Sequence, residues 1–396
     1  MKALSFKGNG AEYFKIWIVN IFLTIITLGL YYPWAKVRNN RYFYGNSELE
    51  GRNFEYHATG KQLFLGFLIS MSVLILYIVI QSISPAGSGL VLLAFFLGLP
   101  WIIWRSLQFN MRMTSFSNVR FGFDASLRQA YVNYLLIPIG LMFVLYGIPL
   151  VMGFMVGFSG GSMSPVIKAV MVVMGILFFP LVIFAFAFMK KRNTNYTLNG
   201  IRYGQGKFST EVQTKPFVMI LLKAFGMAIL LMILFLGLLA IAAMLTGVDE
   251  QFSQLAGNMQ DPEAMENTFG GAIAWLIGIT YLGFIIISMS VFSYTHAKQR
   301  QYVFENTKLD GNIAFSSTLD ALPLAWVSVS NFLVIIFSLG LALPWAKVRA
   351  ARLVCENSLV DTDVGFDQYL TQQQARQSAL GEQLGDAFDV DLGIGI

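Results

Sequence analysis

Long stretches with little or no charge run through the chain and predict eight membrane segments. A helix needs about 20 predominantly apolar residues to cross a ~30 Å hydrocarbon core, and most of these stretches approach that length. Two stretches are long enough for two crossings each and are interrupted by runs of Gly, Ser and Pro. The predicted segments are residues 13–33, 63–82, 90–104, 135–157, 167–189, 217–246, 270–293 and 321–344.

The links between these segments differ sharply in charge. Four links together contain 18 Lys and Arg residues, whereas the three alternate links contain none. Cytoplasmic loops of membrane proteins carry an excess of Lys and Arg, so the four basic links are predicted to be cytoplasmic. The basic links are residues 34–62, 105–133, 190–216 and 293–320. The links without cations are residues 83–89, 158–166 and the acidic 247–269.

The composition supports an integral membrane protein. Only 12% of the residues are charged, against about 25% in a typical soluble domain, and the mean hydropathy is +0.62. These values exclude a soluble enzyme, a disordered chain and a fibrous repeat. The single Cys355 excludes an internal disulfide framework, and His57 and His296 are too far apart for a metal-binding pair, so no metal or cofactor is predicted. The net charge of +5 is expected to come from basic residues that interact with the membrane surface, and no nucleic-acid partner is predicted.

The basic links contain a repeated motif. Residues 20–41 read NIFLTIITLGLYYPWAKVRNNR, and residues 331–352 read NFLVIIFSLGLALPWAKVRAAR. The two align without a gap and share PWAKVR. A third copy, LGLPWIIWR, places Pro100, Trp101 and Arg105 at the spacing of Pro33, Trp34 and Arg38. Gly29 and Pro33 are predicted to end the first helix.

A second element follows the motif and predicts β-hairpins. Residues 46–51, 195–200 and 306–311 contain Asn and Leu at similar spacing and end in Gly. Asn-Gly and Asp-Gly between alternating polar and apolar residues are typical of tight hairpin turns. Because an isolated hairpin is only marginally stable, the hairpins are expected to pair with one another. The predicted turn glycines are Gly51, Gly200 and Gly311.

NIFLTIITLGLYYPWAKVR followed by NSELEGRNFEYHATG resembles the YjgN family of bacterial inner-membrane proteins. The resemblance extends over nearly the whole chain and implies a multi-pass location in the inner membrane. It implies no catalytic or ligand-binding residue, because none is assigned in the family.

The predicted fold is an α-helical polytopic membrane protein with short β-hairpins in its cytoplasmic loops. Residues 1–366 are expected to form one membrane domain of about five degenerate repeats, and residues 367–396 an acidic, flexible tail. The side on which the termini lie stays open. If segments 13–33 and 321–344 span, the last PWAKVR faces the periplasm, opposite to the first copy. If both segments are re-entrant, every repeat stays cytoplasmic, and the polar Asn20, Thr24 and Thr27 would suit such a break.

The aromatic and basic residues of the motif have two interpretations. They can anchor the helix ends at the membrane interface, with the ring at headgroup depth and the cation among the phosphates. They can also form a ring that binds anionic phospholipid headgroups or another anion. The candidate contacts are Trp34, Lys36, Arg38, Arg41, Trp101, Arg105, Trp345, Lys347, Arg349 and Arg352.

Other features suggest a role without identifying a reaction. Gly153 and Gly157 permit close helix packing, either within one chain or in a homo-oligomer. No arrangement of nucleophile and base is visible, so an enzyme is not predicted. The favoured hypothesis is a transport or lipid-handling protein, with repeats around a central path gated by the hairpins. The alternative is an envelope scaffold whose β layer docks partners.

Overall fold

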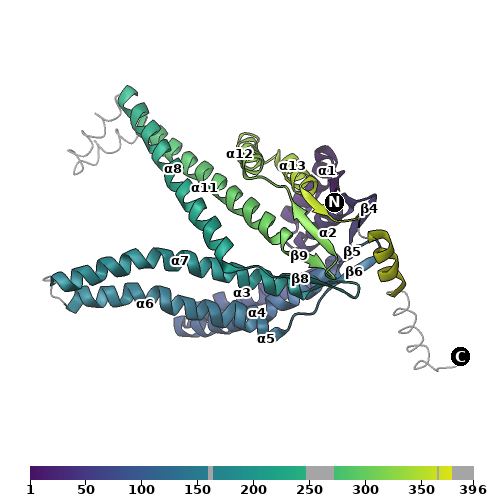
Figure 1. Cartoon of the computed structure of the whole chain (residues 1–396), viewed down its shortest axis with the longest axis horizontal. Coiled ribbons are helices and arrows are strands. Elements are labelled where there is room, and N and C mark those ends of the chain that lie inside the picture. Colours follow the sequence, from purple (N-terminus) through teal and green to yellow (C-terminus); the bar gives the residue numbers. More distant parts are fainter. Residues whose placement is uncertain (159–163, 247–271, 364, 377–396) are drawn as a thin grey trace. The chain divides into compact units, whose positions relative to one another are not determined.

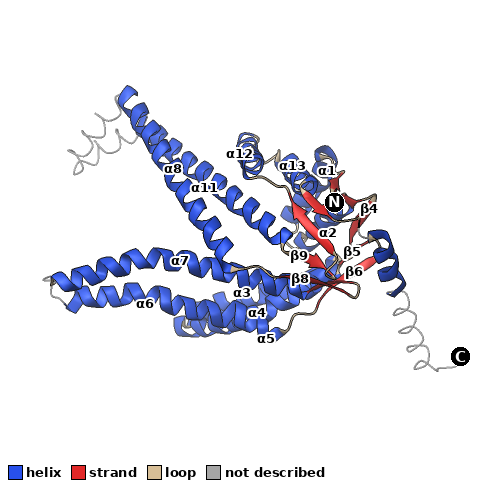
Figure 2. Ribbon diagram, viewed as in Figure 1, coloured by secondary structure: helices blue, strands red, loops and turns tan. Residues whose placement is uncertain are grey.

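The computed structural model describes residues 1–158, 164–246, 272–363 and 365–376 (Figure 1). These residues form two compact units: Met1–Val218 with Arg300–Leu319 and the residues from Leu339 onward, and Met219–Gln299 with Asp320–Ser338. Every described strand lies in the first unit (Figure 2). The predicted acidic link 247–269 and residues 377–396 of the predicted tail lie outside the described residues.

Six helices of the described part are long and apolar enough to cross a membrane. They correspond to six of the eight predicted segments, and their apolar side chains are largely exposed, as lipid contact requires. The helices are α3 (Gly60–Ile83), α4 (Pro85–Arg112), the continuous run of α5 (Leu127–Tyr131), η1 (Val132–Leu136) and α6 (Ile137–Phe158), α7 (Pro165–Gly200), α8 (Thr214–Thr246) and α11 (Ala272–Glu305).

Several of these helices continue beyond the predicted segments into the basic links. Helix α7 extends to Gly200 and α11 to Glu305, because Lys and Arg are good helix formers. The charged residues therefore end the apolar run, but the helix continues through them. An asparagine side chain caps the C-terminal end of some helices. The Asn46 amide donates to the carbonyl of Tyr42 (2.8 Å) after α2, and the Asn306 amide donates to the carbonyl of Tyr302 (2.7 Å) after α11.

The first and last predicted segments are not single membrane-length helices, which corrects the predicted count of eight. Residues 13–33 divide between α1 (Gly10–Ile26) and α2 (Tyr32–Gly45). Residues 321–344 divide between α12 (Ala321–Phe337) and α13 (Leu343–Glu356). A Leu-Gly pair with positive φ lies in each break: 49° and 91° at Leu28 and Gly29, and 50° and 89° at Leu339 and Gly340.

Pro33 also differs from its prediction. It lies in the first turn of α2 and therefore begins the second helix. Proline is tolerated there because the N–H group that it lacks would have no partner within the helix.

The backbone of the first break satisfies its own hydrogen bonds. The N–H groups of residues 27–30 and 32 donate to carbonyls between Leu23 and Gly29, and the N–H of Tyr31 donates to the Thr27 hydroxyl (2.9 Å). Irregular backbone is tolerated inside a membrane only where its polar groups are satisfied. Leu28, at the tip, is 93% exposed. The α1–α2 pair can therefore dip into the bilayer and return, which favours the re-entrant alternative for residues 13–33.

Eleven short strands form one antiparallel sheet, in which four hairpins pair with one another. Each hairpin follows a helix whose C-terminal end reaches the sheet and precedes a helix whose N-terminal end leaves it. The strands are β1 (Lys2–Ala3), β2 (Ser5–Phe6), β3 (Ser47–Leu49), β4 (Arg52–Tyr56), β5 (Thr114–Phe116), β6 (Val119–Phe123), β7 (Ile201–Tyr203), β8 (Gly206–Thr210), β9 (Thr307–Leu309), β10 (Ile313–Ser317) and β11 (Ser358–Val360).

The N-terminal segment closes this sheet into a ring. Strand β1 pairs with β11, with Lys2 opposite Val360, whereas β2 pairs with β3, with Ser5 opposite Glu48. Only Leu4 separates β1 from β2, so the two ends of the strand order belong to one continuous segment. Closure pairs edges that would otherwise stay open to other chains.

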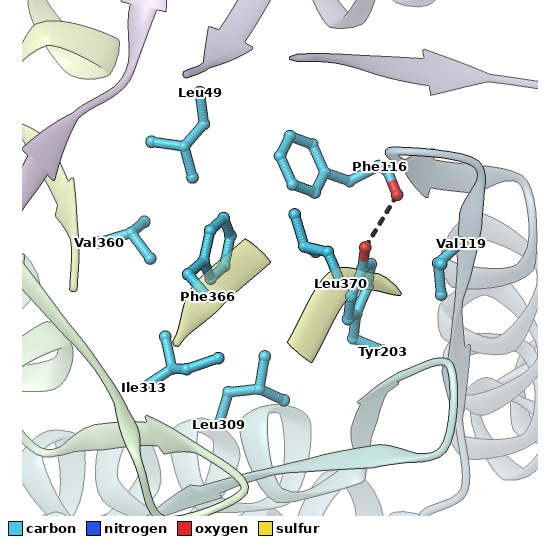
Figure 3. Packing of buried hydrophobic residues seen from close by; sticks show 9 residues of the cluster. All are labelled: Leu49, Phe116, Val119, Tyr203, Leu309, Ile313, Val360, Phe366 and Leu370. Carbon is cyan, nitrogen blue, oxygen red and sulfur yellow. Dashed lines mark hydrogen bonds between the residues drawn. The ribbon is translucent and has the colours of Figure 1, made fainter. Parts of the chain in front are cut away.

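Apolar side chains from all parts of the ring face its interior (Figure 3). Successive hairpins place aromatic residues opposite one another across their shared ladders; the Phe54 and Phe116 ring centroids, for example, are 4.7 Å apart. We call these residues the apolar belt. The belt consists of Leu4, Leu49, Phe54, Phe116, Phe121, Tyr203, Phe208, Leu309, Phe315 and Val360.

Residues 366–376 form a helix that packs against the belt, where the sequence predicted the start of a flexible tail. Phe366 and Leu370 are 6% and 2% exposed and lie among the buried residues of the belt (Figure 3). Positions i and i+4 share one face of a helix, so both side chains point to the same side. A single apolar pair among polar residues is too short a pattern to predict this packing.

One predicted turn glycine is misplaced. Gly51 (φ 77°) and Gly311 (φ 74°) lie in the turns of β3–β4 and β9–β10. Gly200, however, is the last residue of α7, and the turn of β7–β8 contains Gly204 (φ 58°). Asn-Gly is common at helix ends as well as in tight turns, and Asn199-Gly200 belongs to the first class.

Gly29→Ala is expected to destabilise the protein by about 1 kcal/mol, because alanine tolerates a positive φ poorly. No described atom lies within 4 Å of a Cβ built on Gly29, so the effect comes from the backbone alone. Gly66→Ala in α3 is the matched control, because its surroundings are equally open and alanine favours the helix there. Thermal unfolding in detergent measures the difference, and an unchanged Tm for Gly29→Ala would contradict the assigned break.

Candidate functional site

The tryptophans of the two full PWAKVR copies pack onto the first turn of the next helix in the ring. Trp34 lies against Gly60 and beside Phe64, with ring centroids 5.1 Å apart. Trp345 lies against Gly10 in the same manner, with its ring 5.2 Å from that of Phe14. In both cases glycine and phenylalanine are four residues apart and share one helix face. The last repeat therefore docks on the first helix as the first repeat docks on α3.

Two arginines of the motif join the same neighbours. The Arg41 guanidinium donates to the carbonyl of Ala58 (3.0 Å), and the Arg352 guanidinium donates to the carbonyl of Gly8 (3.1 Å). Ala58 and Gly8 each lie two residues before the helix that receives the tryptophan. Four of the ten candidate anion contacts thus hold neighbouring repeats together.

A pocket of about 730 Å³ lies between α1, α2 and α13. Lys36 and Lys347, which occupy the same position in the two PWAKVR copies, both line it. The residues that line it include no Asp or Glu. The lining is therefore cationic, which favours an anionic ligand.

Two buried polar side chains in the lining each have an oxygen atom without a hydrogen-bond partner. Asn20 is 3% exposed, and its amide donates to the Asn39 side-chain oxygen (3.2 Å). The Asn20 Oδ1 atom itself and the hydroxyl of the fully buried Tyr13 have no hydrogen-bond partner. An unpaired buried polar group costs about 1–3 kcal/mol, and such groups mark places where a bound molecule can supply the missing hydrogen bond.

The pocket continues into an apolar surface. Ile21 and Ile25 line it together with the polar residues. Ile25 and the neighbouring Phe22 are 69% and 64% exposed on α1, which is the helix that leads into the break at Leu28 and Gly29. The pocket therefore joins a cationic, hydrogen-bonding region to a surface suited to lipid chains, and the combination fits an amphipathic anion.

The remaining candidate anion contacts lie outside this pocket. Arg38 donates to the Tyr31 hydroxyl (3.2 Å), and Arg105 donates to the Gln108 side chain (3.4 Å). Arg349 and the half-exposed Trp101 are not lining residues either. The structure thus brings two of the seven predicted cations to one pocket and does not gather all seven in it.

Gly153 and Gly157 make no close helix contact in the described part of α6. A Cβ built on either glycine meets no atom within 4 Å. The predicted close packing within the chain is therefore not made at these positions, and a homo-oligomer interface stays a prediction.

Sequence reasoning did not single out Tyr13, Asn39 or Asn40, although all three line the pocket. The adjacent asparagines were a usable signal, because Asn is unfavourable inside a helix unless its side chain has a specific role. Asn20 was predicted to suit a helix break. It lies instead within α1, facing Asn39.

Comparison with known proteins gives a family match over almost the entire chain. A family model described as "Bacterial protein of unknown function (DUF898)" matches residues 1–387. The chain is 30% identical to the inner membrane protein YjgN of Salmonella typhimurium over 371 residues, which cover 91% of this chain and 89% of that protein. It is 38% identical to the inner membrane protein YjgN of Escherichia coli K12 over 136 residues, 34% of each chain. No solved structure matches it.

Gly60→Ala is expected to destabilise the protein by about 1–3 kcal/mol, because the added methyl group would overlap the Trp34 ring and force it to move. Gly45→Ala, near the end of α2, is the matched control because a Cβ there meets no described atom. Tryptophan fluorescence and thermal unfolding should change for the first variant alone. Equal effects of the two substitutions would contradict the docking role of Trp34.

Proposed function

Since this chain belongs to the DUF898 family and is a multi-pass bacterial inner membrane protein like the YjgN proteins, we propose that it handles anionic phospholipids. The observation that carries the proposal is the pocket into which two copies of one motif each place a lysine, Lys36 and Lys347. The phosphate of a lipid headgroup is the ligand assigned to these lysines.

The polar part of the pocket suits such a headgroup. Each basic residue near the membrane surface attracts anionic lipid by about 1 kcal/mol. The unpaired Asn20 oxygen and Tyr13 hydroxyl offer hydrogen bonds to glycerol or headgroup hydroxyls, and Tyr13 can also donate to phosphate. The ligand therefore combines a negative charge with hydroxyl groups, as in phosphatidylglycerol.

The location of the pocket suits a lipid better than a soluble anion. Its volume of about 730 Å³ holds a headgroup and part of its chains, and binding pockets of this kind run from about 300 to 1,000 Å³. Ile21, Ile25 and the exposed apolar face of α1 give the acyl chains a continuous path to the bilayer.

The proposed orientation places the strand ring and the basic links in the cytoplasm. Eighteen cations in the four basic links support this side, because the positive-inside rule acts on short loops. A re-entrant α1–α2 pair then enters from the cytoplasmic leaflet, and the pocket draws lipid from that leaflet. An envelope scaffold that docks partners by strand addition has less support, because the strands of the described residues close into a ring and leave no long free edge.

Lys36→Gln with Lys347→Gln is expected to weaken phosphatidylglycerol binding about 30-fold, because two lysines contribute about 1 kcal/mol each. Native mass spectrometry of the full chain in neutral detergent measures the affinity, with phosphatidylcholine as the uncharged comparison. Arg38→Gln with Arg105→Gln is the matched control, because it removes two cations outside the pocket. Equal losses in both double variants, or no preference for the anionic lipid, would overturn the proposal.

Asn20→Leu is expected to change the Tm little without lipid, because removal of an unpaired buried oxygen, which costs about 1–3 kcal/mol, offsets the loss of the hydrogen bond to Asn39. The same substitution should reduce the stabilisation that added phosphatidylglycerol gives. Thr24→Val is the control, because the Thr24 hydroxyl already bonds to the Asn20 carbonyl (2.6 Å) and should change neither value. An unchanged stabilisation of Asn20→Leu by added phosphatidylglycerol would contradict a role of Asn20 in lipid binding.

A further inference from the structure

We propose that the strand ring is the mouth of a gated pathway for small solutes and that the 366–376 helix is its plug. The proposal rests on the strand ring and the 366–376 helix, and it does not depend on lipid binding at the pocket. Its first basis is position. Phe366 and Leu370 lie at the centre of the apolar belt, which comprises residues from every hairpin and from the N-terminal segment (Figure 3).

The plug has a polar contact at every hairpin turn. Four of these contacts come from four residues of the helix, and the fifth joins a residue just before the helix to the chain's N-terminal amine. The contacts are Arg52–Asp367 (2.8 Å), Gln374 to the Ser117 carbonyl (2.7 Å), the Gln205 N–H to Gln373 (2.9 Å), Tyr369 to Asp310 (2.8 Å) and Met1–Asp363 (3.1 Å). A helix that rested on one side of the ring would reach only some of these turns.

The width of the ring explains why it needs an occupant. Side chains alone just fill a closed sheet of about eight strands, and wider closed sheets leave a central space. This ring has more strands than that, and Phe366 and Leu370 fill its centre. Burial, together with the hydrogen bond to Asp310, raises the pKa of Tyr369, so its hydroxyl stays protonated and continues to donate.

The plug can leave without unfolding the ring. The strands pair with one another through backbone hydrogen bonds, whereas the plug's contacts with the four hairpins all use its side chains. The Arg52–Asp367 pair is exposed on both sides, and exposed ion pairs contribute little stability. Each hairpin strand adjoins a helix at the end away from its turn, so release of the plug from the turns leaves these connections intact.

The first test measures access to the belt. Phe208→Cys in a Cys355→Ala background places one thiol in the belt, and a charged methanethiosulfonate reagent probes it in the full chain. Leu370→Asp should unseat the plug and raise the modification rate by on the order of tenfold, because covered thiols react only during local opening. Gln372→Asp, on the exposed face of the same helix, is the matched control and should leave the rate unchanged.

The second test measures passage in liposomes with potassium and chloride as probes. The full chain should be tight, and both Leu370→Asp and a chain ending at Asp363 should conduct. Ser117→Cys with Gln374→Cys, joined by a short thiol cross-linker in a background that carries Leu370→Asp and Cys355→Ala, should reduce the flux that Leu370→Asp alone allows. The proposal is overturned if the shortened chain elutes as a single species, still binds phosphatidylglycerol, and neither exposes Phe208→Cys nor passes either ion.

Discussion

Closure of the hairpin ring by residues 2–6 is the constraint on which the other features depend. Because the strand order is continuous around the ring, every repeat must leave the sheet and come back to it. Each repeat contains one helix that leaves the sheet and one that comes back to it. The chain comes back to a hairpin in four repeats and to β11 in the fifth. Closure also turns at least one apolar residue of each hairpin strand inward and makes α1 the neighbour onto which Trp345 docks.

The sequence predicts the elements that depend on local pattern. Uncharged runs locate the six long helices, and Asp310-Gly311 marks a real turn. The errors arise where one local signal has two structural meanings. Asn199-Gly200 suits a turn and a helix end alike, and Gly29 with Pro33 interrupts a segment that hydropathy alone makes continuous. Pairing of β1 with β11 joins residues more than 350 positions apart, and no local pattern encodes it.

The candidate site shows the same limit. PWAKVR was visible as an aromatic and basic motif, and its residues divide between two uses that sequence cannot separate. Trp34 and Arg41 face the next repeat and stabilise the ring, whereas Lys36, on another face of α2, lines the pocket. Lys347 reaches the same pocket only because the fifth repeat lies beside the first. The pairing of these two lysines is therefore a product of closure.

The distance along the chain between the two closing strands affects how the protein is made. Strand β1 leaves the ribosome before β11, which follows more than 350 residues later. At roughly 5–20 residues per second this interval is about 20–70 seconds. During it the nascent sheet is an open arc with an unsatisfied edge at Lys2–Ala3, and the helices already in the bilayer hold that arc in place. Closure of the ring thus waits for the late pairing of β1 with β11, and translation pauses or chaperones that act on the nascent arc would govern its yield.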